Sequence, residues 1–354
     1  MFYWLYGEFG INIFHYITVR SLLGFFIGFA LTMVAMPVFI RWAKAKKMRQ
    51  PIYKFAPKTH EGKKNTPTMG GIVFMSSIAI ATLLCANVSE SLIQIALLLI
   101  LAFCIIGYTD DIKKITGEQN DSGLSARAKL YLQIGFSVAI GALLVIYANI
   151  NTDFYIPFIK KPLFDMGYFA IFFWALVIVA SSNAVNLTDG LDGLATVPSV
   201  FAFVSLGVVL YITGNSVLAS YLFLPKAAGA GELMIIAFCG VGALLGFLWH
   251  NSNPAEIFMG DTGSLSLGAL MGFFAIVGKS EILLLLIGFI FVLETGSVII
   301  QIASFKSRGK KVFLMTPLHH HFEMKRWAEN KIIVRFWIIA FLSNVIALLT
   351  LKLR

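Results

Sequence analysis

Charged residues are scarce in this sequence. Asp, Glu, Lys and Arg make up 13% of its 354 residues, whereas hydrophobic residues make up 58%. An ordinary soluble domain carries roughly 25% charged residues, so the composition excludes a water-soluble globular protein and indicates a polytopic membrane protein. The longest polar stretch, 306–331, is too short for a separate soluble domain. The sequence therefore predicts one integral membrane domain over 1–354.

Cysteine is also rare. Cys85, Cys104 and Cys239 each lie inside an apolar run, and none has CxxC spacing. This pattern argues against a disulfide framework and a zinc site, and it predicts buried packing residues. The net charge of +10 comes from basic residues that flank apolar runs, where they set topology and contact lipid headgroups. A partner nucleic acid is therefore not expected.

Long apolar runs are what the sequence has in abundance. About ten of them approach the length that crosses a hydrocarbon core. The runs are Leu22–Ile40, Gly70–Ala86, Leu92–Tyr108, Leu130–Tyr147, Tyr168–Val185, Leu194–Thr213, Leu233–Trp249, Leu265–Val277, Ile282–Phe305 and Ile332–Leu351. The Leu265 run is short and can extend back to Thr262. An all-α protein with about ten transmembrane helices follows, and an even number places both termini on one side.

Basic residues predict the orientation of these spans. If the segment 41–64 is cytoplasmic, seven of the 28 Lys and Arg residues fall outside and the remaining 21 inside. The seven are Arg20, Lys160, Lys161, Lys226, Lys279, Lys352 and Arg354. The positive-inside rule then places both termini in the periplasm. On that outer side, residues 154–158 and 162–164 flank a short basic turn and predict a small β-hairpin.

The first two predicted inner loops carry residues suited to phosphates and a metal ion. The first ends in KKNTPTMGG (63–71), where Lys63 and Thr68 offer a charge and a hydroxyl to phosphate oxygens, although topology alone explains lysines here. The second opens with Asp110-Asp111. Adjacent carboxylates at a C-terminal helix end oppose the macrodipole, so a cation such as Mg²⁺ is expected to compensate. The alternative is a solvated helix end paired with nearby lysines such as Lys114.

The third inner loop is NAVNLTDGLDG (183–193). If it opens a helix, Asp189 and Asp192 place their carboxylates on one face, and its glycines allow a ligand to approach the backbone. Asn186 adds an amide that both donates and accepts. The alternative is an ordinary acidic turn.

The fourth inner loop is HNSNPAEIFMGDTGS (250–264), which contains Asn251. Asp261 stands between glycines just before an apolar run, where it either binds a ligand or caps the helix. Phe258 either stacks on a base or is an ordinary interfacial aromatic.

The acidic residues converge on the predicted inner face. Six of the eight Asp residues fall there, namely Asp110, Asp111, Asp121, Asp189, Asp192 and Asp261. Asp contributes little to topology, so this bias indicates a site. Glu294 is the one acidic residue well inside an apolar run, which favours a functional role. It alternatively satisfies backbone groups at a helix break near Gly296.

Three of these motifs, Asp110-Asp111, NLTDGLDG and FMGDTGS, occur in an order and spacing that resembles the polyprenyl-phosphate N-acetylhexosamine-1-phosphate transferases. The segment TPLHHHFE (316–323) is similar to the triple-histidine signature of the phospho-N-acetylmuramoyl-pentapeptide transferase branch. Without the family, three histidines in a loop indicate a polar surface tract. A sister enzyme that uses UDP-GlcNAc shares the Asp motifs, and the histidines disfavour it. A transporter would place ionisable groups near the bilayer midplane, where only Glu294 lies.

The resemblance implies a bacterial inner-membrane enzyme of peptidoglycan synthesis, with a cytoplasmic active site, Mg²⁺ dependence and a homodimeric state. It would transfer phospho-MurNAc-pentapeptide from UDP-MurNAc-pentapeptide to undecaprenyl phosphate, giving lipid I and UMP. The implied catalytic residues are Asp110, Asp111 and Asp261, with Mg²⁺ on Asp261 and the other two as further candidate ligands. The implied substrate-binding residues are Lys63, Thr68, Lys114, Asn186, Asp189, Asp192, Asn251, Phe258, His319, His320 and His321. Whether Asp110 acts as a base or orients the lipid phosphate stays open, because that phosphate is largely ionised at neutral pH.

Overall fold

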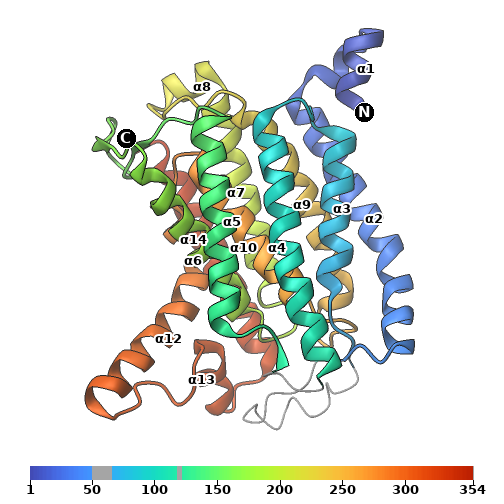
Figure 1. Cartoon of the computed structure of the whole chain (residues 1–354), viewed down its shortest axis with the longest axis vertical. Coiled ribbons are helices and arrows are strands. Elements are labelled where there is room, and N and C mark those ends of the chain that lie inside the picture. The colour runs from blue at the N-terminus through green and yellow to red at the C-terminus, as the bar shows by residue number, and fades with distance from the viewer. Residues whose placement is uncertain (50–65, 118–121, 354) are drawn as a thin grey trace.

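A computed structural model describes residues 1–49, 66–117 and 122–353 of the chain. The chain folds into a bundle of long, roughly parallel and antiparallel helices, with almost no strand (Figure 1). The longer helices are α2 (Ile17–Ala45), α3 (Gly70–Cys85), α4 (Ser91–Thr116), α5 (Ala126–Ile146), α6 (Phe169–Thr188), α7 (Thr196–Gly214), α9 (Ala230–Asn251), α10 (Gly260–Val277), α12 (Phe289–Arg308) and α14 (Glu329–Thr350). The shorter ones are α1 (Phe2–Phe9), α8 (Ser216–Tyr221), α11 (Leu284–Ile287) and α13 (Leu318–Met324), with a 3-10 turn at Asn12–His15.

The helices match the predicted membrane spans closely. Among the described residues, nine helices are long and apolar enough to cross a bilayer, and α3 is a shorter apolar helix of 16 residues. The predicted polytopic all-α membrane protein is confirmed. One predicted span has different bounds, because the run 282–305 divides at Gly288 into the short α11 and the candidate span α12. The short Leu265 run does extend back, and α10 begins at Gly260.

Helix α10 forms the centre of the bundle. All 18 of its residues are buried, and it packs against α3, α4, α6 and α7. Small residues make this close packing possible, as is usual between membrane helices. A methyl group at Gly107 of α4 would overlap the backbone of Asp261 and Thr262, and one at Gly268 would overlap the backbone of Ser181. The polar start of α10 is therefore held tightly against α4.

The two ends of the bundle differ in character. The chain termini lie at one end, and α13 and the lower part of α12 lie at the other (Figure 1). The predicted hairpin is present, since β1 (Asp153–Phe154) pairs antiparallel with β2 (Phe164–Asp165). The three cysteines are free thiols, with Cys85 and Cys239 buried and Cys104 partly buried, so the predicted packing role is confirmed. We call the end where α4 ends at Thr116 and α10 begins at Gly260 the site end.

Candidate active site

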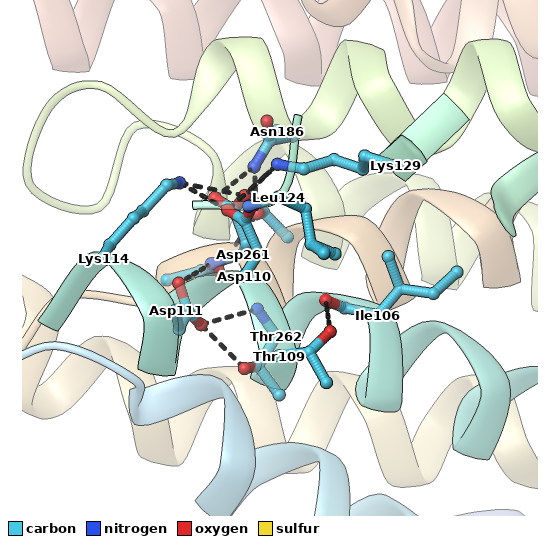
Figure 2. Close-up of polar contacts among 12 residues, drawn as sticks. Ile106, Thr109, Asp110, Asp111, Lys114, Leu124, Lys129, Asn186, Asp261 and Thr262 are labelled. Carbon is cyan, nitrogen blue, oxygen red and sulfur yellow. Dashed lines mark hydrogen bonds and ion pairs between the residues drawn. The ribbon is translucent and has the colours of Figure 1, made fainter. Parts of the chain in front are cut away.

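Asp111 joins helix α4 to the first turn of α10 (Figure 2). It accepts hydrogen bonds from the backbone N–H groups of Asp261 (3.0 Å) and Thr262 (2.9 Å), and from the Thr262 hydroxyl (2.7 Å). The first N–H groups of a helix have no partner within it, and they form its positive end. The sequence predicts Asp111 at the end of a helix, and that detail is wrong, because α4 continues to Thr116. Asp111 thus caps α10 from a neighbouring helix.

Asp110 and Asp261 share two lysines. Lys114 Nζ lies 2.7 Å from Asp110 Oδ2 and 3.1 Å from Asp261 Oδ2. Lys129 Nζ lies 3.0 Å from Asp110 Oδ2 and 2.5 Å from Asp261 Oδ2. The other oxygen of Asp110 accepts from the backbone N–H of Leu124 (2.8 Å). Two carboxylates and two ammonium groups from α4, α5 and α10 therefore meet at one point, which we call the Asp–Lys centre (Figure 2).

The amide of Asn186 completes the Asp–Lys centre. Its Nδ2 donates to Asp261 Oδ1 and to Ser264 Oγ, each at 2.9 Å. The Asp261 side chain is thus held by a lysine pair and an amide, and the structure gives it no hydrogen bond to an N–H of its own helix among the described residues. Sequence reasoning did not single out Lys129 or Ser264. In the sequence, Lys129 is one of several basic residues in the second predicted inner loop. The positive-inside rule explains such residues without any role in a site.

The turn that follows α6 carries Asp189 and Asp192. The predicted arrangement in a helical first turn is wrong, since α6 ends at Thr188 and a non-helical turn leads to α7. Asp192 Oδ2 accepts from Asn253 Nδ2 (3.0 Å) and from the backbone N–H of Ala255 (3.1 Å). Its carboxylate therefore ties this turn to the loop between α9 and α10.

Asp189 has a different environment from Asp192. Burial raises the pKa of Asp189 to about 8, and the negative charges of Asp261, Asp111 and Asp192 contribute to the rise. The direction follows from low-dielectric surroundings and like charges, both of which disfavour the ionised carboxyl group. Asp189 is thus electrostatically coupled to the Asp–Lys centre, and added positive charge there would lower its pKa.

Asn251 is fully occupied by protein partners. Its Oδ1 accepts from the backbone N–H of Gly193 and from the hydroxyl of Thr196, each at 3.0 Å. Its Nδ2 donates to the carbonyl of Ile257 at 2.9 Å, and the residue is buried. Asn251 holds the turn after α6 against the loop before α10.

The segment around Thr68 lies beside the start of α10. The backbone N–H of Phe258 donates to Pro67, and the carbonyl of Phe258 accepts from Gly70 (2.9 Å each). A methyl group at Gly260 would lie 3.2 Å from the buried Thr68 hydroxyl. The structure therefore brings Thr68 to the centre and leaves Phe258 half-buried at its edge. The predicted residues Lys63 and Asp121 lie outside the described residues.

The three histidines form part of the short helix α13, and each has a different partner. His319 Nδ1 lies 3.1 Å from Glu294 Oε2, His320 Nδ1 lies 2.6 Å from Glu323 Oε2, and the backbone N–H of Leu314 donates to His321 Nδ1 (3.1 Å). His319 is buried, and its Nε2 lies against Gly190, where a methyl group would overlap it. The rings of His319 and His320 are in contact, with their centroids 4.1 Å apart. His319 is the one whose Nε2 lies against the turn after α6.

Glu294 accepts from the backbone N–H of His319 as well as from its ring. The alternative of a helix break near Gly296 is wrong, because α12 is continuous from Phe289 to Arg308.

The Asp–Lys centre has the oxygen ligands that a magnesium ion needs. Among the described residues, no three His, Cys, Asp or Glu side chains converge as a metal site. Mg²⁺ needs only one or two carboxylates when substrate phosphates supply further oxygens. The Oδ2 atoms of Asp110 and Asp261 both lie within 3.1 Å of Lys114 Nζ, so two hard oxygen atoms lie around the same lysine ammonium group. These oxygens suit Mg²⁺ in kind, and in this structure the ammonium groups of Lys114 and Lys129 lie between them.

Comparison with known proteins agrees with this geometry. The family model described as glycosyl transferase family 4 matches residues 93–279, which hold the Asp–Lys centre. A phospho-N-acetylmuramoyl-pentapeptide-transferase signature matches residues 63–75. Curated proteins named phospho-N-acetylmuramoyl-pentapeptide-transferase are 58% identical in Nitratiruptor sp. and Aliarcobacter butzleri and 56% identical in Campylobacter hominis, each over the full length of both chains.

The matched regions include every element that builds the centre. The Asp pair of α4, the start of α10 and the turn after α6 all lie within residues 93–279, which the family model matches. Together with full-length identity above 50%, they show that the chain belongs to the phospho-N-acetylmuramoyl-pentapeptide transferase family, within glycosyl transferase family 4.

Proposed function

We propose that this chain transfers phospho-MurNAc-pentapeptide from UDP-MurNAc-pentapeptide to undecaprenyl phosphate, releasing UMP and forming lipid I. The observation that carries the proposal is the Asp–Lys centre, in which carboxylates and lysines from three helices meet at one end of a membrane bundle. A reaction between a membrane lipid and a soluble nucleotide needs a site at the boundary between bilayer and water. The centre lies at one end of the bundle, where α4 ends and α10 begins, which supports the proposal.

The proposed chemistry is an in-line displacement at phosphorus. An oxygen of the lipid phosphate attacks the β-phosphorus of the nucleotide, and the bond between that phosphorus and the bridging oxygen breaks. UMP leaves with the electron pair, and the sugar keeps its phosphate. Both reactants are anions, so catalysis rests on positioning and charge neutralisation rather than on covalent help from the protein.

The lysines and the carboxylates of the centre have different roles in this proposal. Lys114 and Lys129 are placed to neutralise phosphate oxygens, because their ammonium groups already bridge two carboxylates. We assign Asp110 and Asp261 to holding Mg²⁺, which would supply positive charge for the diphosphate and the departing phosphate. Asp110 Oδ1 is engaged by the backbone N–H of Leu124 and its other oxygen by two lysines, so an orienting role fits it better than that of a base.

Other predicted residues take supporting or donor-side roles in this proposal. Asp111, Asp192 and Asn251 are held by protein partners, so we assign them to positioning the segments around the centre. Asn186 contacts Asp261, Asp189 is coupled to the centre by charge, and Phe258 precedes the start of α10, so these three are assigned to the nucleotide. Thr68 and the basic loop before it, which holds Lys63, are assigned to phosphate, and His319, His320 and His321 to the sugar side.

We further propose that the protein is a multi-pass component of a bacterial inner membrane, with the site end in the cytoplasm. The count of basic residues supports this orientation, and the position of both termini at the opposite end agrees with an even number of spans. A single domain over 1–354 and a homodimer remain predictions from the sequence and from the resemblance.

One assay tests the proposed reaction. Purified protein in lipid nanodiscs is given undecaprenyl phosphate, Mg²⁺ and either UDP-MurNAc-pentapeptide or UDP-GlcNAc, and UMP release is measured. We expect release with the first donor, at a rate at least about tenfold above the second. Equal use of both donors, or use of UDP-GlcNAc alone, would move the chain to the sister activity.

A further inference from the structure

The buried acid Glu294, which has no role in the proposed function, forms a hydrogen-bonded pair with the ring of His319. Both residues are buried, and they come from α12 and α13. Glu294 Oε2 lies 3.1 Å from His319 Nδ1, and Glu294 Oε1 accepts from the backbone N–H of His319 at 3.2 Å. An ionised acid inside an apolar helix is costly, so a pairing this specific calls for a role.

The opposite side of the His319 ring has no partner. Within the described part of the chain, Nε2 of His319 is buried and makes no hydrogen bond. It lies against Gly190, in the turn after α6, and that turn also carries Asp189. A buried polar atom without a partner costs free energy unless something supplies the missing bond. Gly190 belongs to the turn that the proposed function assigns to the donor, so the donor is the group that we expect to supply the missing bond.

The Glu294 carboxylate decides which nitrogen of the ring carries the proton. Both oxygens of Glu294 accept from the backbone N–H of His319, so the carboxyl group acts as an acceptor in this contact, and we assign the ring proton to Nδ1. Nε2 then carries a lone pair and acts as an acceptor. The arrangement is the same as in metal or catalytic sites where a carboxylate fixes the tautomer of a histidine.

We propose that Glu294 is a positioning residue that holds His319 with Nδ1 protonated, so that Nε2 accepts a hydrogen bond from the sugar-nucleotide donor. The group that it recognises is a hydroxyl or an amide N–H of that donor. The inference rests on the proposed function for the identity of the donor. It goes beyond that function by assigning Glu294 to substrate selection, through the acceptor nitrogen Nε2 of the ring that it holds.

The isosteric variant Glu294→Gln separates this role from simple packing. The two oxygens of Glu294 receive two different donors, the backbone N–H and the ring N–H. A glutamine can accept at one position only, and its NH₂ group at the other would face Nδ1. The backbone N–H cannot change its role, so the amide is expected to donate to Nδ1 and to move the ring proton to Nε2.

We expect Glu294→Gln to raise the KM for UDP-MurNAc-pentapeptide at least about tenfold, with a smaller effect on kcat. The KM for undecaprenyl phosphate should change less than about twofold. Glu294→Asp keeps an acceptor-only group and should retain more activity than Glu294→Gln, although it fits the space less well. If the glutamine variant is as active as the aspartate variant, or if it changes both KM values equally, the proposal is wrong.

One further variant is a control for the substitution, and another tests the contact at His319 Nε2. Glu256→Gln alters a second glutamate that bonds a histidine, since Glu256 Oε2 lies 2.7 Å from His250 Nδ1, but this side chain is largely exposed. It should leave the donor KM unchanged. Gly190→Ala places a methyl group where His319 Nε2 lies, so it should raise the donor KM as Glu294→Gln does. An unchanged donor KM in Gly190→Ala would contradict a contact between this nitrogen and the donor.

A spectroscopic measurement tests the tautomer without relying on activity. Protein labelled with ¹⁵N at its six histidines is reconstituted in bilayers near pH 8, and the His319 signals are assigned by their loss in His319→Gln. We expect a protonated Nδ1 and an unprotonated Nε2 in the wild type, and the reverse in Glu294→Gln. A wild-type ring that carries its proton on Nε2 would overturn the inference. Absence of UMP release by the wild type would instead contradict the proposed function and leave the tautomer result standing.

Discussion

Asp261 connects the two lysines of the centre to Asn186. Its two oxygens contact Lys114, Lys129 and Asn186, and its backbone N–H is bound by Asp111. The sequence identified Asp261 because an Asp between glycines at the start of an apolar run is unusual. It left open whether the side chain caps its helix. The structure answers this, since the capping role belongs to Asp111 on another helix.

The first prediction concerns the charge of Asp261. Asp261→Asn keeps the shape of the side chain but removes a negative charge from between two lysines, and an amide is a much poorer Mg²⁺ ligand. We expect kcat/KM for UMP release to fall at least about 100-fold, with little change in thermal unfolding. Asp165→Asn, an exposed aspartate of the hairpin, is the matched control and should keep full activity. Wild-type-like turnover of Asp261→Asn would remove this residue from the reaction.

A second residue-scale prediction follows from Glu281, which lies in the turn between α10 and α11. Burial raises the pKa of Glu281 to about 7, and Trp174 Nε1 donates to it at 3.2 Å. An unfolded glutamate titrates near pH 4.3, so the folded protein binds more protons between about pH 4 and 7. The free energy of unfolding should therefore fall as pH rises through this window and level off above it.

Glu281→Gln keeps an acceptor for Trp174 and removes the titration. We expect its melting temperature in detergent to depend less on pH between about 5 and 7 than that of the wild type. Glu8→Gln changes an exposed glutamate and should follow the wild-type curve. Parallel curves for the wild type and Glu281→Gln would show that this carboxyl group titrates normally in the folded protein.

At the scale of residues, the carboxylates of the site could be read from the sequence but their partners could not. Asp110, Asp189 and Asp261 belong to motifs, whereas Lys129 reaches Asp261 from 132 positions away along the chain. Such a contact depends on how α5 packs beside α4 and α10, and no local pattern encodes it. The same applies to Glu294, whose position in an apolar run predicted a function but did not identify His319 as its partner.

At the scale of elements, the joint between α4 and α10 determines the geometry of the centre. Gly107 allows the two backbones to approach closely, and Asp111 then reaches the first N–H groups of α10. Apolar runs predicted nearly all the helices, because the length of a run is a strong signal in a membrane protein. Apolar runs do not reveal the polar ends of helices. For this reason α4 and α10 each extend beyond their predicted bounds into the site. The break at Gly288 was missed because the surrounding run is continuously apolar.

Gly107→Ala tests this joint. The added methyl group would overlap the backbone of Asp261 and Thr262, which can only be relieved by separating the helices. We expect destabilisation of about 1–3 kcal/mol, seen as a lower melting temperature, together with a loss of kcat/KM for UMP release. Gly135→Ala in α5 is the control, because its methyl group would meet nothing within 4 Å. An active and stable Gly107→Ala protein would contradict the close packing of these helices.

At the scale of the whole molecule, the proposed orientation rests on charge and on the number of spans. Exposed Lys47 lies just after α2 at the site end, and exposed Lys161 lies in the hairpin at the opposite end. In a background without the three native cysteines, Lys161→Cys should react with a membrane-impermeant maleimide added to intact cells. Lys47→Cys should react only after the membrane is opened. Labelling of Lys47→Cys from outside would place the site end in the periplasm and contradict the proposed access to a cytoplasmic nucleotide.

The central claim is that a phosphosugar, and not the sugar alone, moves to the lipid phosphate. The most direct measurement uses UDP-MurNAc-pentapeptide with ³²P in the β-phosphate, undecaprenyl phosphate, Mg²⁺ and the purified protein. The account predicts that the label appears in the lipid product and that the released nucleotide is unlabelled UMP, both of which should be lost in Asp261→Asn. Release of labelled UDP, with no label in the lipid, would show transfer of the sugar alone and would contradict the account.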